Sequence, residues 1–177
     1  RTRSVGVPVR PEGPEAGLPR GWPNETNAGV VILMSARKDV GPGLVLRLAA
    51  LRGVKLTVAV GRDRRLRKSI ESIRNLAPRP FEIVGWSEEL PRLLRASHLL
   101  ISKAGGATVK EALSAVCPMI VNHIMPDTEE GHARFLVEMN AGAIGIPHPP
   151  CIDNVPYALP NCVYHRNRVA AHSAQIS

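Results

Sequence analysis

Short apolar runs alternate with helical segments along the middle of this chain, and this alternation restricts the fold more than any other feature. The runs predict strands at residues 30–34, 55–60, 81–84, 99–102, 119–122 and 143–146. The segments between them predict helices at residues 44–51, 66–76, 88–95, 107–116 and 129–139. Strands and helices that alternate at this spacing form right-handed βαβ units. The sequence therefore predicts an α/β fold, a Rossmann-like parallel sheet with helices on both faces.

The 177 residues are enough for one domain of ordinary size with a proper core. Hydrophobic residues make up 44% of the chain and aromatic residues only 3%, so the predicted core consists of Val, Leu, Ile and Ala. Residues 1–28 are rich in Pro, Gly and charge, and are interpreted as a linker or extended arm, with a disordered terminus as the alternative. The predicted domain is 29–147, and residues 148–177 form an irregular tail.

The charge of the chain indicates anionic partners. Lys and Arg number 23 against 15 acidic residues, a formal net charge of +8. Such an excess fits a nucleotide diphosphate, an anionic membrane surface or nucleic acid. The low aromatic content and the absence of a recognisable nucleic-acid module argue against nucleic acid.

Cysteine and hydropathy patterns exclude several other classes. The three cysteines form no C-x-x-C motif, so neither a disulfide framework nor a zinc site is predicted, and a reducing cytosolic setting is expected. His123 and His132 lack a third ligand, so no metal is expected. No signal peptide and no apolar run long enough to span a bilayer is found.

One stretch, Leu99 to Gly131, has the composition of a phosphate site. A buried strand leads into Gly105-Gly106 and then a helix, whose free N–H groups and positive dipole end suit a phosphate or diphosphate. Thr108 adds a hydroxyl in the first turn, and Glu111 could accept hydrogen bonds from ribose hydroxyls. The alternative is a plain tight turn followed by an acid that complements the helix dipole.

The predicted strands end in residues suited to ligand binding. In parallel sheets, ligands bind outside the carboxyl ends of the strands. Glycines, bases and acids gather at these ends, in residues 35–38, 61–62, 85–86, 102–108 and 122–131. Arg62 is a candidate to face a diphosphate. However, residues 61–68 contain five bases and one acid, and we favour a solvated face there, with a membrane-facing patch as another alternative.

The segment ISKAGGATVKEALSAVCPMIVNHIMPDTEEGHARFLVEMNAGAI resembles the donor-binding segment of a glycosyltransferase family. This family contains monogalactosyldiacylglycerol synthases, processive diacylglycerol glucosyltransferases and, more distantly, the lipid II-forming MurG transferase. Its pattern is T/S-K-x-G-G/P-x-T-x-x-E-A, a strand, and P-x-x-E-E/A-G-N. The matching residues are Lys103, Gly105, Thr108, Glu111, Ala112, Pro126, Glu129, Glu130 and Gly131, and His132 stands in place of the Asn. Residues 5–11 are also similar to the tract that joins the two domains of this family.

The resemblance implies the C-terminal, donor-binding domain of a GT-B fold. It implies a UDP-hexose as substrate and no cofactor. It places the uracil at Gly85-Trp86, for which the alternative is a helix-entry turn capped by Ser87. It places the donor sugar at Glu129 and Glu130, which could instead form an acidic first turn with Thr128 as N-cap.

The donor-binding residues expected from the residues and the resemblance together are Gly85, Trp86, Ser102, Lys103, Gly105, Gly106, Thr108, Glu111, Pro126, Glu129, Glu130 and Gly131, with Arg62 as the diphosphate candidate. Catalytic residues are not assigned, because the N-terminal acceptor domain that normally supplies the base is absent from this chain. The first loop also departs from the glycine-rich loop of the family, since Ala36 and Arg37 would obstruct a close backbone approach.

The implied function is inverting transfer of a hexose to a lipid acceptor such as diacylglycerol, which makes a glycolipid. The expected location is cytoplasmic and peripheral at the membrane, and the chain alone is expected to bind donor without turnover. Two alternatives remain, a non-catalytic nucleotide-sugar-binding or regulatory subunit and another sugar-nucleotide enzyme such as an epimerase.

Overall fold

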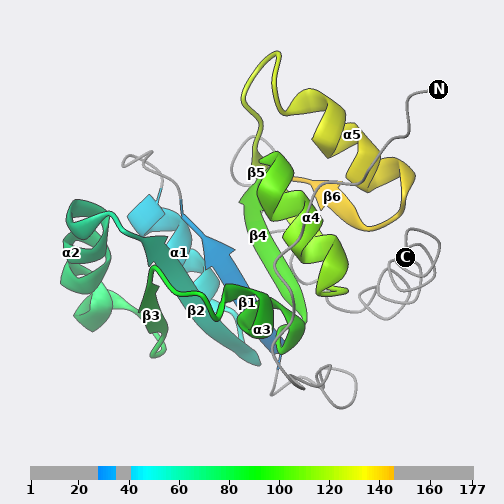
Figure 1. Ribbon diagram of the computed structural model, residues 1–177. Coiled ribbons are helices and arrows are strands. Elements are labelled where there is room, and N and C mark those ends of the chain that lie inside the picture. Colours follow the sequence, from blue (N-terminus) through cyan, green and yellow to red (C-terminus); the bar gives the residue numbers. More distant parts are fainter. Residues whose placement is uncertain (1–27, 35–40, 146–177) are drawn as a thin grey trace, which may run out of the picture.

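A computed structural model of the protein describes residues 28–34 and 41–145. Within them the chain forms a six-stranded parallel sheet in the order β3-β2-β1-β4-β5-β6 (Figure 1). The strands are β1 (Ala28–Leu33), β2 (Val54–Gly61), β3 (Glu82–Gly85), β4 (Leu99–Lys103), β5 (Met119–His123) and β6 (Gly142–Ile144). The predicted linker, the loop at 35–38 and the tail at 148–177 lie outside the described residues, apart from Ala28 at the start of β1.

Helices connect the successive strands, which confirms the predicted α/β fold class. They are α1 (Gly41–Ala50), α2 (Arg64–Ser72), the 3-10 helix η1 (Arg74–Leu76), α3 (Leu90–Arg95), α4 (Gly106–Ser114) and α5 (Glu130–Glu138). Every predicted strand and helix is present with shifted ends. The hydrophobic periods therefore located the elements correctly.

The helices form a layer on each face of the sheet. In Figure 1, α1 lies behind the sheet and α3 and α4 lie in front of it. Behind, Leu48 of α1 belongs to the same buried cluster as Ile32 of β1. In front, Val109 of α4 belongs to the same cluster as Val31 of β1. Because consecutive strand residues face opposite sides, both sides of the central strand are buried, as its uninterrupted apolar sequence predicts.

The order of the strands reverses between β1 and β4. These two strands pair in register, with Val30 opposite Leu99. Just before the register begins, the backbone N–H of His98 donates to the carbonyl of Gly29 at 2.8 Å. The backbone N–H of Gly29 in turn donates to Nδ1 of the His98 imidazole at 3.0 Å. His98 is 9% exposed, so this side chain extends the backbone pairing inside the protein.

The helix predicted at 66–76 is wrong in its extent. It consists of α2 and η1, with Ile73 between them in a distorted helical conformation. It also begins earlier, at Arg64, because the Asp63 carboxylate accepts hydrogen bonds from the N–H groups of Arg65 and Leu66. This N-cap starts the helix two residues before its first buried residue, Leu66.

Two predicted capping alternatives are also wrong. Ser87 is not the N-cap of α3; its hydroxyl accepts from the N–H of Glu89, and the helix begins after Glu89 with a proline in its first turn. Thr128 is not the N-cap of α5, since Glu129 holds that position and makes no side-chain cap bond there. In both cases the helix starts later in the chain than the capping side chain requires.

We expect Gly142→Ala to destabilise the protein strongly. A Cβ at Gly142 would lie 2.3 Å from the carbonyl oxygen of Met119 on the paired strand β5, and backbone cannot move aside cheaply. The expected loss in the free energy of unfolding is about 1–3 kcal/mol, measured by urea denaturation.

The matched control is Gly43→Ala in α1, where an added Cβ meets no atom of the described residues within 4 Å. Alanine in a helix restricts the unfolded chain, so this variant should gain about 0.5–1 kcal/mol. Equal effects of the two substitutions would contradict the close approach of β6 to β5.

Candidate functional site

A pocket of about 330 Å³ lies at the carboxyl ends of β1, β2 and β3. Its apolar lining comes from the strand ends and from α3, namely Leu33, Met34, Ala59, Val84, Leu90 and Leu93. Its more polar lining consists of Gly61, Gly85, Trp86, Ser87, Glu89 and Glu111. The pocket therefore opens beside the point of strand-order reversal, the part of an open α/β sheet where ligands bind.

Three of the predicted donor-binding residues meet in this pocket. Gly85 ends β3 and Trp86 follows it, and Glu111 extends to the same pocket from the second turn of α4. The carboxylate of Glu111 is half-buried in a largely apolar surrounding. A carboxylate there is a hydrogen-bond acceptor in the wall of a largely apolar pocket, which Glu89 and Ser87 also line.

Arg62 contacts Trp86 directly. The guanidinium carbon of Arg62 lies 4.1 Å from the centroid of the indole ring, within the range of a cation–π interaction. Trp86 is 49% exposed and lines the pocket, whereas Arg62 does not line it. Arg62 thus lies against the wall of the pocket.

Within the described part of the chain, the turn between β4 and α4 presents backbone donors that have no backbone partner. Gly105 occupies the N-cap position of α4 and, as a glycine, has no side chain that could accept hydrogen bonds from the first N–H groups of the helix. The first intrahelical bond runs from the N–H of Val109 to the carbonyl of Gly105. The N–H groups of Gly106, Ala107 and Thr108 precede it, and Thr108 is half-exposed in the same turn. This helix end has the geometry that binds anions in other proteins.

In this turn the space around Gly106, rather than its dihedral angle, favours glycine. Gly105 has φ −65°, an ordinary conformation that does not itself require glycine. A Cβ at Gly106 would instead lie 2.9 Å from Cε1 of His132. Nδ1 of His132 is buried and makes no hydrogen bond within the described part of the chain. His132 and Gly106 therefore bring α5 close to the start of α4.

Lys103 and Glu129 join the same two segments through charge. The ammonium of Lys103 donates to Oε1 of Glu129, and the N–H of Met125 donates to Oε2 at 3.1 Å. Glu129 is only 5% exposed. Its carboxylate thus connects the end of β4 with the loop that follows β5.

Opposing effects act on the pKa of Glu129. Burial alone would raise it, but the hydrogen bonds from Lys103 and Met125 and the charges of Lys103 and His123 outweigh burial and hold the pKa below its ordinary value of 4.5. Since folding lowers this pKa, the stability that the carboxylate contributes is fully present above the ordinary value. It is lost as the pH falls through the pKa of the folded state.

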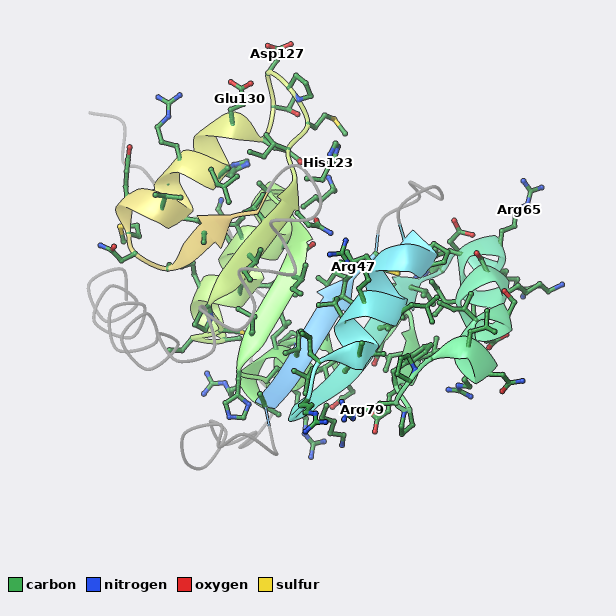
Figure 2. All side chains as sticks on the ribbon, turned by 180° about the vertical axis from the view of Figure 1, so that it is seen from behind. Arg47, Arg65, Arg79, His123, Asp127 and Glu130 are labelled. Atoms are coloured by element: carbon green, nitrogen blue, oxygen red, sulfur yellow. The ribbon has the colours of Figure 1, made fainter. Side chains whose placement is uncertain are left out.

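The remaining predicted residues lie apart from the pocket. Pro126, Glu130 and Gly131 are exposed on the loop between β5 and α5 and at the start of α5. Figure 2 shows Glu130 and Asp127 projecting from this end of the domain away from the sheet. Ser102 is 2% exposed inside β4. The structure therefore divides the predicted residues between the pocket, the α4 N-terminus and an outer loop.

Sequence reasoning missed the apolar wall of the pocket. Leu90 and Leu93 of α3 have the spacing of a core face, and only the crossover of α3 from β3 to β4 turns them towards the pocket. Among the residues described, no group of three or more His, Cys, Asp or Glu side chains could hold a metal ion. None of the helices within 28–34 and 41–145 combines the length and hydrophobicity needed to cross a membrane.

The fold and the site together define a Rossmann-like α/β domain with its candidate site at the carboxyl edge of the sheet. The chain belongs to the glycosyltransferase family 28 C-terminal domain, whose model matches residues 42–172. The match extends beyond both the described residues and the predicted domain end at 147. The resemblance to a GT-B glycosyltransferase is thereby confirmed.

Individual relatives have related activities. A processive diacylglycerol beta-glucosyltransferase of Bacillus pumilus is 24% identical over 85% of this chain and 41% of its own length. Monogalactosyldiacylglycerol synthase 3 of Arabidopsis thaliana is 28% identical over 79% of this chain and 33% of its own length. A spinosyn rhamnosyltransferase solved with thymidine diphosphate has the same fold, with a TM-score of 0.61, 19% identity, and coverage of 94% of this chain and 50% of that one. The chain spans less than half the length of these curated relatives.

We expect Glu129→Gln to reduce the acid sensitivity of the protein. At neutral pH the variant should lose about 1–3 kcal/mol of unfolding free energy, because Lys103 loses its charged partner. Between about pH 5 and about pH 3, stability should fall more steeply in the wild type than in the variant. Chemical denaturation at several pH values measures both effects.

The control for this substitution is Glu82→Gln. Glu82 pairs with Lys55 at 3.4 Å on the surface, where both side chains are more than half exposed. This variant should keep the pH dependence of the wild type. An unchanged acid slope in Glu129→Gln would contradict the stabilising role of the buried carboxylate.

We expect Gly106→Ala to destabilise the protein through His132. The imidazole must turn aside to admit the new methyl group, and because it is the end of a flexible side chain the cost is about 1 kcal/mol. In a His132→Ala background the same substitution should cost little or stabilise. Thermal unfolding of the four proteins gives the coupling, and additive effects would refute the contact.

Proposed function

We propose that this domain binds a UDP-hexose and forms the donor half of an inverting glycosyltransferase that makes a glycolipid. The observation that carries the proposal is the convergence of Gly85, Trp86 and Glu111, from separate βα units, on one pocket beside the N-terminus of α4. The family match supports a transferase, and the names of the relatives support a hexose donor.

The proposed nucleoside position lies in the pocket. The uracil contacts backbone groups at Gly85 and the ring of Trp86, within the apolar wall made by the strand ends. The ribose hydroxyls donate to the carboxylate of Glu111. Such an acceptor in an apolar pocket fixes the orientation of the ligand.

The diphosphate extends from there to the N-terminus of α4. Thr108 and Glu111 are three residues apart on one helix, so they lie on the same face and bring a phosphate contact next to a ribose contact. The N–H groups of Gly106 to Thr108 donate hydrogen bonds to the phosphate oxygens, and Lys103 lies close by. As the diphosphate leaves, these donors stabilise the growing negative charge.

The sugar faces the loop between β5 and α5. Glu130 is exposed in the first turn of α5 and offers free carboxylate oxygens to sugar hydroxyls. Glu129 is already engaged by Lys103 and Met125, so its contribution includes holding this loop beside the donor. Pro126 and Gly131 shape the same loop.

The acceptor belongs to the membrane. Diacylglycerol occurs in the names of both curated relatives, and we propose a lipid acceptor of this class. Arg64, Arg65 and Lys68 are exposed on α2 and make it strongly basic, which fits an anionic membrane surface and a peripheral, cytoplasmic location. The acceptor domain and its catalytic base lie outside this chain, so the chain alone should bind donor without transferring the sugar.

Calorimetric titration with UDP tests the donor site. UDP should bind, and UMP should bind more weakly because it lacks the second phosphate. Glu111→Ala should lose about 1–3 kcal/mol of UDP binding free energy, the cost of leaving polar partners unpaired. The control is Glu138→Ala, which removes an exposed carboxylate at the far end of α5 and should bind UDP like the wild type.

A folded protein that gives no heat with UDP or UDP-sugars would refute the donor site. UDP binding that is unaffected by Glu111→Ala would refute the ribose position and leave only a phosphate contact. Formation of an epimerised sugar nucleotide by the full-length protein would replace the transferase proposal.

A further inference from the structure

We propose that Arg62 is a positioning residue that holds Trp86 as the base-side wall of the pocket, and that it is not a ligand of the diphosphate. This inference rests on the proposed function, because it assigns the way in which the nucleoside end of that site is built. It assigns to Arg62 a role that the charge of the residue alone would not indicate.

The register of the sheet puts these two residues together. Gly61 pairs with Gly85, so Arg62 and Trp86 directly follow the ends of two adjacent strands. The pairing shifts by one residue between Ala59 and Gly61, which indicates a bulge in β2. Without that extra residue, Gly61 itself would stand opposite Trp86. Bulges of this kind redirect side chains at the ends of strands.

The backbone on both sides of Arg62 is constrained. Gly61 has a φ of +60°, which glycine adopts without strain and other residues do not. On the other side, Asp63 caps α2 with its carboxylate. Between these two fixed points, the guanidinium of Arg62 extends over the indole at 4.1 Å from the ring centroid.

The position of the guanidinium determines what it can do. It lies over the ring of Trp86, and Trp86, not Arg62, lines the pocket. An indole that is 49% exposed has freedom to turn unless something covers it. A cation over its face restricts that freedom and keeps the indole in the wall where a flat nucleobase binds.

This arrangement makes a distinctive prediction about ligands. If Arg62 bound the phosphates directly, its loss would weaken the binding of phosphate-bearing ligands such as UDP only. A residue that acts through Trp86 should affect uridine, which has no phosphate, and UDP by the same factor. The comparison of these two ligands therefore separates the two roles.

The sequence contains two tryptophans, Trp22 and Trp86. The test uses the full chain with Trp22→Phe, so that all tryptophan fluorescence comes from Trp86. Uridine and UDP are titrated by tryptophan fluorescence and calorimetry against Arg62→Ala, Arg62→Lys, Trp86→Ala and the double variant Arg62→Ala/Trp86→Ala. Arg62→Ala should weaken both ligands about 2- to 5-fold, the scale of an exposed cation–π contact. Arg62→Lys should restore part of this loss, because an ammonium can also lie over the ring.

Two further measurements depend on the contact itself. In the Trp86→Ala background, Arg62→Ala should leave the affinity for uridine unchanged, since the residue through which it acts is absent. In the unliganded protein, Arg62→Ala should shift the emission of Trp86, as the ring loses its cover. Arg134→Ala is the charge-matched control, because Arg134 is exposed on α5 and does not line the pocket, and it should change neither uridine affinity nor Trp86 emission.

Each failure has its own pattern. If the wild type binds both ligands and Arg62→Ala weakens only UDP, Arg62 is a diphosphate ligand and this inference is overturned while the donor site stands. An equal loss for Arg62→Ala with and without Trp86 also overturns it. If the folded wild type binds neither ligand, the proposed function fails and this inference fails with it.

Discussion

The parallel pairing of β1 with β4 is the contact on which the rest of the domain depends. It joins two half-sheets, one that continues from β1 to β3 and one that continues from β4 to β6. The helices of the first half cover one face and those of the second half cover the other. A gap at the carboxyl edge follows from this reversal, and the pocket lies beside it. The two hydrogen bonds between Gly29 and His98 hold the start of this pairing.

The site at this edge has two parts with different physical characters. The pocket is mostly apolar, with Glu111 as a carboxylate from α4. The region around the N-terminus of α4 is polar and close-packed, where Lys103 and Glu129 neutralise each other and connect the β4 end to the loop after β5. Because these charges compensate within the protein, the backbone donors of Gly106 to Thr108 remain the main positive feature at this helix end. An elongated ligand with a flat end and a charged centre would match this arrangement of an apolar pocket beside a polar helix N-terminus.

Local patterns located the strands and helices well because buried parallel strands have uninterrupted apolar sequences. Helix limits were less predictable. The apolar period of 66–76 continues through Ile73, but the Asp63 cap and the 3-10 turn set the real ends. For the site, the phosphate-type turn and Glu111 could be recognised from their order along one βα unit. The contact of Arg62 with Trp86 could not, because it depends on a one-residue register shift between two strands.

By itself, the sequence determined the fold class and the family, and it indicated the segments of the candidate site. These properties are encoded locally, in hydrophobic periods and in short motifs of glycines, Thr108 and Glu111. Only the tertiary structure decided which of these residues share a pocket, that Glu129 is buried against Lys103, and that Arg62 lies over Trp86. The reason is that those contacts join segments that are distant in the chain. The distances between these segments are set by strand register and helix crossover, and no local pattern contains either of them.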